Sequence, residues 1–127
     1  MTQKTMTGGE AVVETLIANG IDTIFGLPGA QLDPIFAALH DRQDRITMVH
    51  GRHEQGPAYA AFGYAASTGK PGVSFTVPGP GFFNAGAGMV TAWGMNAPCL
   101  YFSGQLRLPA INKGFGALHE IPNQFEM

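Results

Sequence analysis

The sequence has little charge and only one cysteine, and each shortage excludes some classes of function. Charged residues make up 13% of the 127 residues, about half the share of an average globular domain. The seven Lys and Arg residues form no cluster and the net charge is −2, so electrostatics favour neither nucleic acid nor a membrane surface as a partner. Cys99 cannot form a disulfide or a thiolate metal site within one chain, which fits a reducing, cytoplasmic setting.

Long hydrophobic runs are also missing, whereas glycine is abundant. No stretch approaches transmembrane length and residues 1–4 do not resemble a signal peptide, so we expect no membrane partner. Glycine accounts for 18 residues, about twice its usual share. A chain with so little charge for a solvated surface is expected to face other protein or to carry a ligand groove. Its length suits one domain with a single core.

Hydrophobic periodicity predicts four helices that alternate with four strands. The first helix is expected between an N-cap at Thr7, with Glu10 as its capping-box partner, and Gly20. Later helices are predicted over 31–40, 54–67 and 82–95, and strands over 21–25, 46–49, 73–77 and 99–102. This order is typical of an α/β fold with a parallel sheet flanked by helices. Residues 106–118 are interpreted as a loop, and 121–127 as the start of another helix.

Turn-forming or functional residues follow all four predicted strands. These segments are Gly26-Leu27-Pro28-Gly29, His50 to Glu54, Pro78 to Gly81, and Ser103-Gly104-Gln105. Ligands of open α/β sheets bind outside the carboxyl ends of the strands, so we expect a site at this rim. Glu54, between a strand and an alanine-rich helix, is the candidate centre. The alternative is an ordinary first-turn glutamate that the helix dipole stabilises.

Glycines and histidines each allow two interpretations. Gly86, Gly88 and Gly94 lie inside a predicted helix, where each costs about 1 kcal/mol relative to alanine. Close packing within the domain and close packing at a subunit interface explain them equally well. His50 and His53 are three residues apart in a predicted loop without a carboxylate or thiolate at regular ligand spacing, which does not favour a metal site.

Several short pieces between about residues 7 and 105 carry a resemblance to a known family, in the right order and spacing. They are Gly26-Leu27-Pro28-Gly29, Arg52-His53-Glu54-Gln55-Gly56, Gly63-Tyr64-Ala65, Thr68-Gly69-Lys70-Pro71-Gly72-Val73, Gly79-Pro80-Gly81, Asn84 and Ser103-Gly104-Gln105. Together they resemble the N-terminal, pyrimidine-binding domain of thiamine diphosphate-dependent enzymes in the acetolactate synthase-like family. This group also takes in benzaldehyde lyase, oxalyl-CoA decarboxylase and 2-hydroxyacyl-CoA lyase.

The resemblance implies roles for individual residues. In this family the glutamate that matches Glu54 hydrogen-bonds the N1′ atom of the aminopyrimidine and activates the cofactor, which serves as electron sink for 2-oxo acids or related 2-hydroxyacyl compounds. The resemblance assigns Pro28, Gly29, Pro80 and Asn84 to the cofactor pocket, together with Glu54.

The substrate side departs from the family pattern. Relatives commonly carry Phe-Gln-Glu after the fourth strand, with Phe and Gln facing the substrate, where this chain has Leu118-His119-Glu120. His119, Gln105 and His53 are therefore the candidate substrate contacts. Phe62 replaces a glutamate that is frequent in the third helix of relatives.

The resemblance also implies what lies outside this chain. Relatives bind the diphosphate through Mg²⁺ on a C-terminal domain, normally that of a neighbouring subunit in a homodimer or homotetramer. Its Gly-Asp-Gly motif does not occur here. We therefore expect 1–127 to be a single truncated pyrimidine-binding domain, without its last helix and strand and inactive alone. The alternatives are a separately encoded small subunit, as in sulfopyruvate decarboxylase-like enzymes, and a non-catalytic assembly module.

Overall fold

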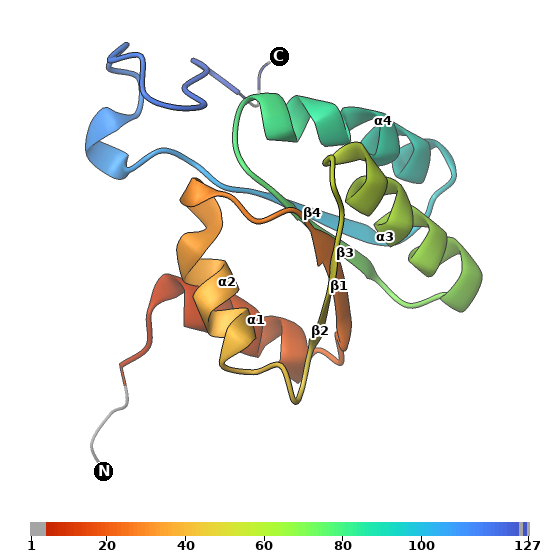
Figure 1. The fold of residues 1–127 in the computed structure, drawn as a ribbon. Helices are drawn as coiled ribbons and strands as arrows, with labels where there is room; N and C mark the ends of the chain where they lie inside the picture. The colour runs from red at the N-terminus through yellow and green to blue at the C-terminus, as the bar shows by residue number, and fades with distance from the viewer. Residues whose placement is uncertain (1–4, 125, 127) are drawn as a thin grey trace.

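The computed structural model of the chain describes residues 5–124 and 126 (Figure 1). Helices and strands alternate in the predicted order, and most of their ends lie within a few residues of the predicted ones. The elements are α1 (Gly8–Ala18), β1 (Thr23–Gly26), η1 (Ala30–Leu32), α2 (Asp33–His40), β2 (Thr47–His50), α3 (Gln55–Thr68), β3 (Gly72–Thr76), α4 (Pro80–Gly94), β4 (Cys99–Ser103) and η2 (Leu108–Ala110). No helix in the described part of the chain is long and apolar enough to cross a membrane.

The four strands form one parallel sheet in the order β2-β1-β3-β4. Helices α1 and α2 cover one face of this sheet, and α3 and α4 cover the other (Figure 1). The direction of travel through the sheet reverses at β1, because β2 lies on one side of it and β3 on the other. The predicted α/β fold with a parallel sheet and flanking helices is confirmed.

The main hydrophobic core lies between the sheet and the layer formed by α1 and α2. Every residue of the central strand β3 is buried. The members of this core are Val13, Leu16, Ile21, Ile24, Leu32, Ala38, Leu39, Ile46, Val73, Phe75 and Val77. Large β-branched and aliphatic side chains fill this side, as expected for parallel strands covered by helices on both faces.

Helices α3 and α4 pack closely because small residues face one another. A Cβ atom added to Gly88 would lie 2.7 Å from the Ala58 Cβ and 2.9 Å from the Ala58 carbonyl carbon. The Tyr101 hydroxyl bonds the carbonyl oxygens of Ala58 and Gly88, at 3.1 and 3.3 Å, and so ties the two helices to β4. Burial raises the pKa of the Tyr101 hydroxyl, which keeps it protonated as a donor.

Gly86, Gly88 and Gly94 of α4 do not share one explanation, whether packing within the domain or packing at a subunit interface. Gly88 is explained by packing within the domain. A Cβ atom on Gly86 or Gly94 would meet no atom within 4 Å, so the described chain does not require glycine at either position.

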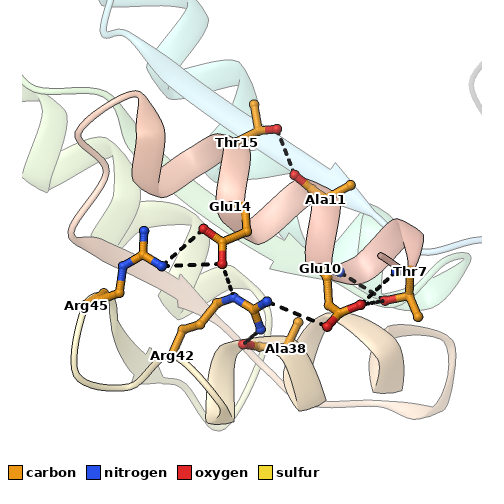
Figure 2. Close-up of polar contacts among 8 residues, drawn as sticks. All are labelled: Thr7, Glu10, Ala11, Glu14, Thr15, Ala38, Arg42 and Arg45. Atoms are coloured by element: carbon orange, nitrogen blue, oxygen red, sulfur yellow. Dashed lines mark hydrogen bonds and ion pairs between the residues drawn. The ribbon is translucent and has the colours of Figure 1, made fainter. Parts of the chain in front are cut away.

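A capping box closes the start of α1, and an ion-pair network joins α1 to the end of α2 (Figure 2). The Thr7 hydroxyl accepts from the Glu10 amide at 3.2 Å, and the Glu10 carboxylate accepts from the Thr7 amide at 2.7 Å. This confirms the predicted capping box. Arg42, just after α2, binds both Glu10 and Glu14, and Arg45 also binds Glu14.

Three predictions about local structure need correction. The helix predicted over 31–40 begins as the 3-10 turn η1, and the α-helix starts only at Asp33, with Pro34 in its first turn. The loop predicted over 106–118 contains the 3-10 turn η2. The helix predicted from Ile121 is wrong for the described residues, because 122–124 and 126 form turns. Residues 125 and 127 lie outside the described part.

Candidate functional site

The carboxyl ends of the strands meet at one edge of the sheet. Gly26 pairs with His50 and Thr76 pairs with Ser103, so the ends of neighbouring strands lie level. The chain reverses its direction of travel between β1 and β3, and crevices that bind ligands open at such switch points. The segments that follow these two strands therefore border the expected crevice.

Glu54 lies at the N-cap position of α3, but its side chain does not cap that helix. Its Oε2 atom instead accepts a hydrogen bond from Asn84 Nδ2, at 2.9 Å, across the gap between α3 and α4. The Oε1 atom has no hydrogen-bond partner among residues 5–124 and 126. The residue is half-buried, so the geometry differs from that of a freely solvated first-turn glutamate.

Gly81 allows the first turn of α4 to approach this carboxylate. A Cβ atom at Gly81 would lie 2.5 Å from Val77 Cγ2 and 3.2 Å from Glu54 Oε1. Position 81 has no room for a larger residue, because the methyl group of alanine would clash with Val77 and press against Glu54. Gly81, Asn84 and Glu54 therefore form one contiguous site at the start of two neighbouring helices.

The Pro28-Gly29 turn lies beside the end of β3. A Cβ atom on Gly29 would collide with Val77 Cγ1, so the turn after β1 touches the residue that follows β3. Pro28 and Pro80 are exposed, and Pro80 occupies the first turn of α4. The structure thus places these proposed pocket residues around the same end of β3 as Gly81.

His119 lies over the turn before α4. Its Nδ1 atom is 3.1 Å from Gln31 Oε1, and Gln31 Nε2 donates to the Leu118 carbonyl at 2.9 Å. A Cβ atom on Gly79 would lie 2.7 Å from the His119 carbonyl oxygen. Hydrogen bonds to Gln31 therefore hold the loop that carries His119 next to the switch point.

The other two candidate substrate contacts lie at the edges of this region. His53 is exposed, and its Nδ1 atom accepts from the Gln55 amide at 3.3 Å. Gln105 is exposed, and its Oε1 atom accepts from the Leu106 amide at 2.7 Å. Gln105 also lines a groove of about 600 Å³ together with Gln31 and Leu118. His50, expected in a loop, instead ends strand β2 and stacks on Phe36.

Sequence reasoning missed two glutamines and gave Gly81 no role of its own. Gln31 clamps the loop of His119, and Gln124 binds the Gly79 amide at 2.6 Å. Neither glutamine belongs to a motif, and their contacts span 88 and 45 residues, so no local signal could reveal them. Among the described residues, no three His, Cys, Asp or Glu side chains gather in a group that could hold a metal ion.

Comparison with known proteins gives one consistent result. A profile of the family described as "Thiamine pyrophosphate enzyme, N-terminal TPP binding domain" matches residues 6–127. The probable 2-ketoarginine decarboxylase AruI of Pseudomonas aeruginosa is 38% identical over 125 residues, which cover 98% of this chain and 22% of that protein.

Acetolactate synthases give similar matches. The large subunit of Parasynechococcus marenigrum is 41% identical over 110 residues, covering 85% of this chain and 18% of that protein. The isozyme 2 large subunit of Escherichia coli is 40% identical over 116 residues, covering 91% and 20%. The chain thus spans only about a fifth of the length of these relatives. With the family profile matching almost its entire length, the chain belongs to the N-terminal TPP-binding domain family of thiamine pyrophosphate enzymes.

Proposed function

We propose that this chain is the pyrimidine-side half of a thiamine diphosphate-dependent active site. The complete protein would be a cytoplasmic carbon–carbon lyase or ligase, a transferase or a decarboxylase, and it would act on 2-oxo acids or related 2-hydroxyacyl compounds. One observation carries the proposal: Asn84 holds one oxygen of the Glu54 carboxylate, while the other oxygen remains without a protein partner in the described chain. The names of the relatives, a decarboxylase and acetolactate synthases, support the reaction class.

The residues present fit the pyrimidine end of this cofactor. An aminopyrimidine is flat and carries ring nitrogens, so it needs a hydrogen-bonding group beside surfaces without bulky side chains. Glu54 Oε1 supplies the hydrogen-bonding group, and Gly81, whose added Cβ atom would lie 3.2 Å from Oε1, leaves the adjoining backbone without a side chain. Gly29 and Gly81 both abut Val77, and neither has room for a Cβ atom. Pro28 and Pro80 add rigid, exposed apolar surface at the same place.

Glu54 would act as the proton-exchanging group of this half-site. We propose that its Oε1 shares a proton with the N1′ atom of the aminopyrimidine, a role that suits a positioned, half-buried carboxylate. Asn84 would orient the carboxylate through Oε2, so that Oε1 faces the cofactor. Bound thiamine diphosphate supplies the electron sink for making or breaking a bond next to a carbonyl carbon.

Substrate would approach from the side of the sheet edge where the loop of His119 lies. His119, Gln105 and His53 are the proposed contacts, and the groove beside Gln31 and Gln105 supports this direction of approach. Mg²⁺ and the diphosphate would be held by another domain, since this chain offers no cluster of metal ligands in its described part.

The outer surface of α4 carries exposed apolar side chains, which suits contact with an apolar surface of another protein. Phe83, Val90 and Trp93 are exposed by 42%, 69% and 83%, and their spacing places them along one side of the helix. We refer to these three residues, with Gly86 between them, as the outer stripe. We propose that the diphosphate-binding domain of a neighbouring subunit covers it in a homodimer or homotetramer, because an apolar surface of this kind is typical of an interface.

The direct test is Glu54→Gln in the full-length protein that contains this segment. Glutamine keeps the size of the side chain and can still bond Asn84, but it cannot exchange a proton. Because general acid–base groups contribute about 10²- to 10⁴-fold, the hydrogen–deuterium exchange at C2 of bound thiamine diphosphate should slow at least about a hundredfold. Exchange is measured by proton NMR after acid quench and is normalised to bound cofactor.

The matched control is Glu14→Gln, which removes a carboxylate from α1, the helix on the face of the sheet opposite α3 (Figure 1). This variant should exchange C2 at the wild-type rate. If Glu54→Gln also stays within a few-fold of the wild-type rate, Glu54 does not activate the cofactor.

A further inference from the structure

Gln124 is a buried side chain that connects the last described segment to the turn before α4. It is only 3% exposed. Its Oε1 atom accepts from the Gly79 amide at 2.6 Å, and its Nε2 atom donates to Ser103 Oγ at 3.3 Å. Both ends of the carboxamide are therefore engaged, one at the turn after β3 and the other at the last residue of β4.

Gly79 depends on this acceptor. It is the N-cap residue of α4, and the amides at the start of a helix have no acceptor within the helix. Gly79 is buried, has a φ of +61°, and lies under the His119 carbonyl oxygen. A buried N–H group that loses its acceptor pays the full desolvation penalty. The side chain of Gln124 thus anchors the backbone where α4 begins.

The N-terminal part of α4 also carries two residues that lie against Glu54. Gly81 brings the backbone of the turn against Oε1, and Asn84 donates to Oε2 at 2.9 Å. A regular helix moves as a rigid unit over so short a distance. A shift of the helix start at Gly79 would therefore change the position of Asn84 relative to Glu54.

We propose that Gln124 is a positioning residue, which fixes the start of α4 and through it keeps Asn84 and Gly81 in place against Glu54. Its consequence for the cofactor rests on the function proposed above, whereas its effect on α4 does not. A glutamine that merely filled the protein interior would predict a loss of stability without any change at Glu54.

The test uses three variants of the full-length protein. Gln124→Met keeps the length of the side chain but removes both hydrogen bonds. Gln124→Glu retains an acceptor for Gly79 and, when burial keeps it protonated, a donor for Ser103. Gln43→Met is the matched control. Gln43 is exposed and lies between α2 and β2, so it is at the amino edge of the sheet and not at the carboxyl edge that carries the candidate site.

The first measurement needs no cofactor. Hydrogen–deuterium exchange with mass spectrometry reports the protection of a peptide that covers residues 78–86. Gln124→Met should speed its exchange about tenfold or more, since the anchor of the helix start is lost. Gln124→Glu and Gln43→Met should stay close to wild type. Unchanged protection in Gln124→Met would overturn the inference.

The second measurement is the C2 exchange rate per bound thiamine diphosphate. A misplaced Asn84 should slow this rate about ten- to a hundredfold in Gln124→Met, with recovery in Gln124→Glu. A rate within twofold of wild type, despite lost protection at 78–86, would show a merely structural role and overturn the inference.

Glu54→Gln separates this inference from the proposed function. If Glu54→Gln exchanges C2 as fast as wild type, the function proposed for Glu54 is wrong, and protection at 78–86 alone decides whether Gln124 fixes α4. If C2 exchange is slow in Glu54→Gln but runs at the wild-type rate in Gln124→Met, the proposed function of Glu54 stands and the positioning role of Gln124 is wrong.

Discussion

Alanine substitutions at Gly86 and Gly88 can test what sets the distance between α3 and α4. The two glycines lie two residues apart in the same helix and point to different sides. Replacing either with alanine gains about 1 kcal/mol of helix propensity. Their surroundings differ, because a Cβ atom on Gly86 meets nothing within 4 Å, whereas one on Gly88 would lie 2.7 Å from the Ala58 Cβ.

The cost at Gly88 can be worked out from those contacts. Carbon atoms pack best at about 3.5–4.0 Å, so the new methyl group requires the helices to separate by about 1 Å. Backbone atoms of Ala58 and Tyr59 lie at 2.9 and 3.0 Å from it and cannot rotate away. Overpacking of this kind costs about 1–3 kcal/mol, and we expect the upper part of that range.

We therefore expect opposite effects of the two substitutions on the free energy of unfolding. Gly86→Ala should stabilise the protein by about 1 kcal/mol, and Gly88→Ala should destabilise it by about 1–2 kcal/mol. With a urea m-value of about 1–3 kcal/mol/M, the difference of about 2–3 kcal/mol should separate the two unfolding midpoints by about 0.7–3 M. Urea titrations followed by circular dichroism measure both values. Equal midpoints would refute the view that Gly88 is kept small by contact with α3.

Gly86 also tests the outer stripe. If a neighbouring subunit packs on this stripe, Gly86→Ala should weaken self-association of the full-length protein although it stabilises the fold. Sedimentation velocity over a range of concentrations measures the dissociation constant. An unchanged constant would place Gly86 outside the subunit contact.

Two further predictions concern the framework. Tyr101→Phe removes the hydroxyl that bonds the carbonyls of Ala58 and Gly88, and it should cost about 1 kcal/mol in urea unfolding; an unchanged midpoint would contradict a structural role for this bond. The hydrogen bond from Arg42 lowers the pKa of Glu14, so this pair stabilises the fold above the unfolded-state pKa of about 4.3 and loses its effect as pH falls through the lower folded-state pKa. The stability advantage of wild type over Glu14→Gln should therefore shrink between about pH 5 and pH 3, and a pH-independent difference would contradict this assignment.

Local sequence patterns were sufficient to predict the order of the elements. The capping box at Thr7 was predictable because both of its partners lie within four residues of sequence. The parallel sheet followed from the alternation of helical and strand patterns, since short connections between them permit little else. The residues after the strands were also the basis for expecting a site at the carboxyl edge of the sheet.

The ends of elements depended on contacts that the sequence does not display. Strand β2 includes His50 because this residue pairs with Gly26 on β1, and the local sequence alone suggested a loop. Pro34 lacks an amide hydrogen and tolerates only the first turn of a helix, which fits an α-helix that begins at Asp33 after a 3-10 turn. The described residues after Ile121, 122–124 and 126, form turns, although a helix was predicted there.

For the candidate site, the sequence suggested Glu54 as the centre, but it did not reveal the long-range contacts around this residue. Glu54 stood out because it follows a strand and begins a helix. Its bond to Asn84 spans 30 residues, and the bond from Gly79 to Gln124 spans 45. Contacts at such separations arise from the packing of whole elements, so no spacing rule could have supplied them.

Asn84 and Gly88 lie four residues apart in α4, so both lie on the side of the helix that faces α3. Gly88 faces Ala58, and this contact sets the distance between α3 and α4. Glu54 lies at the start of α3 and Asn84 lies in α4, so the same distance also sets the 2.9 Å bond between their side chains. Any substitution that forces the helices apart at Gly88 should therefore disturb the carboxylate as well as the fold. The close packing of Gly88 against Ala58 thus supports the candidate site indirectly, because it sets the distance between the helices that carry Glu54 and Asn84.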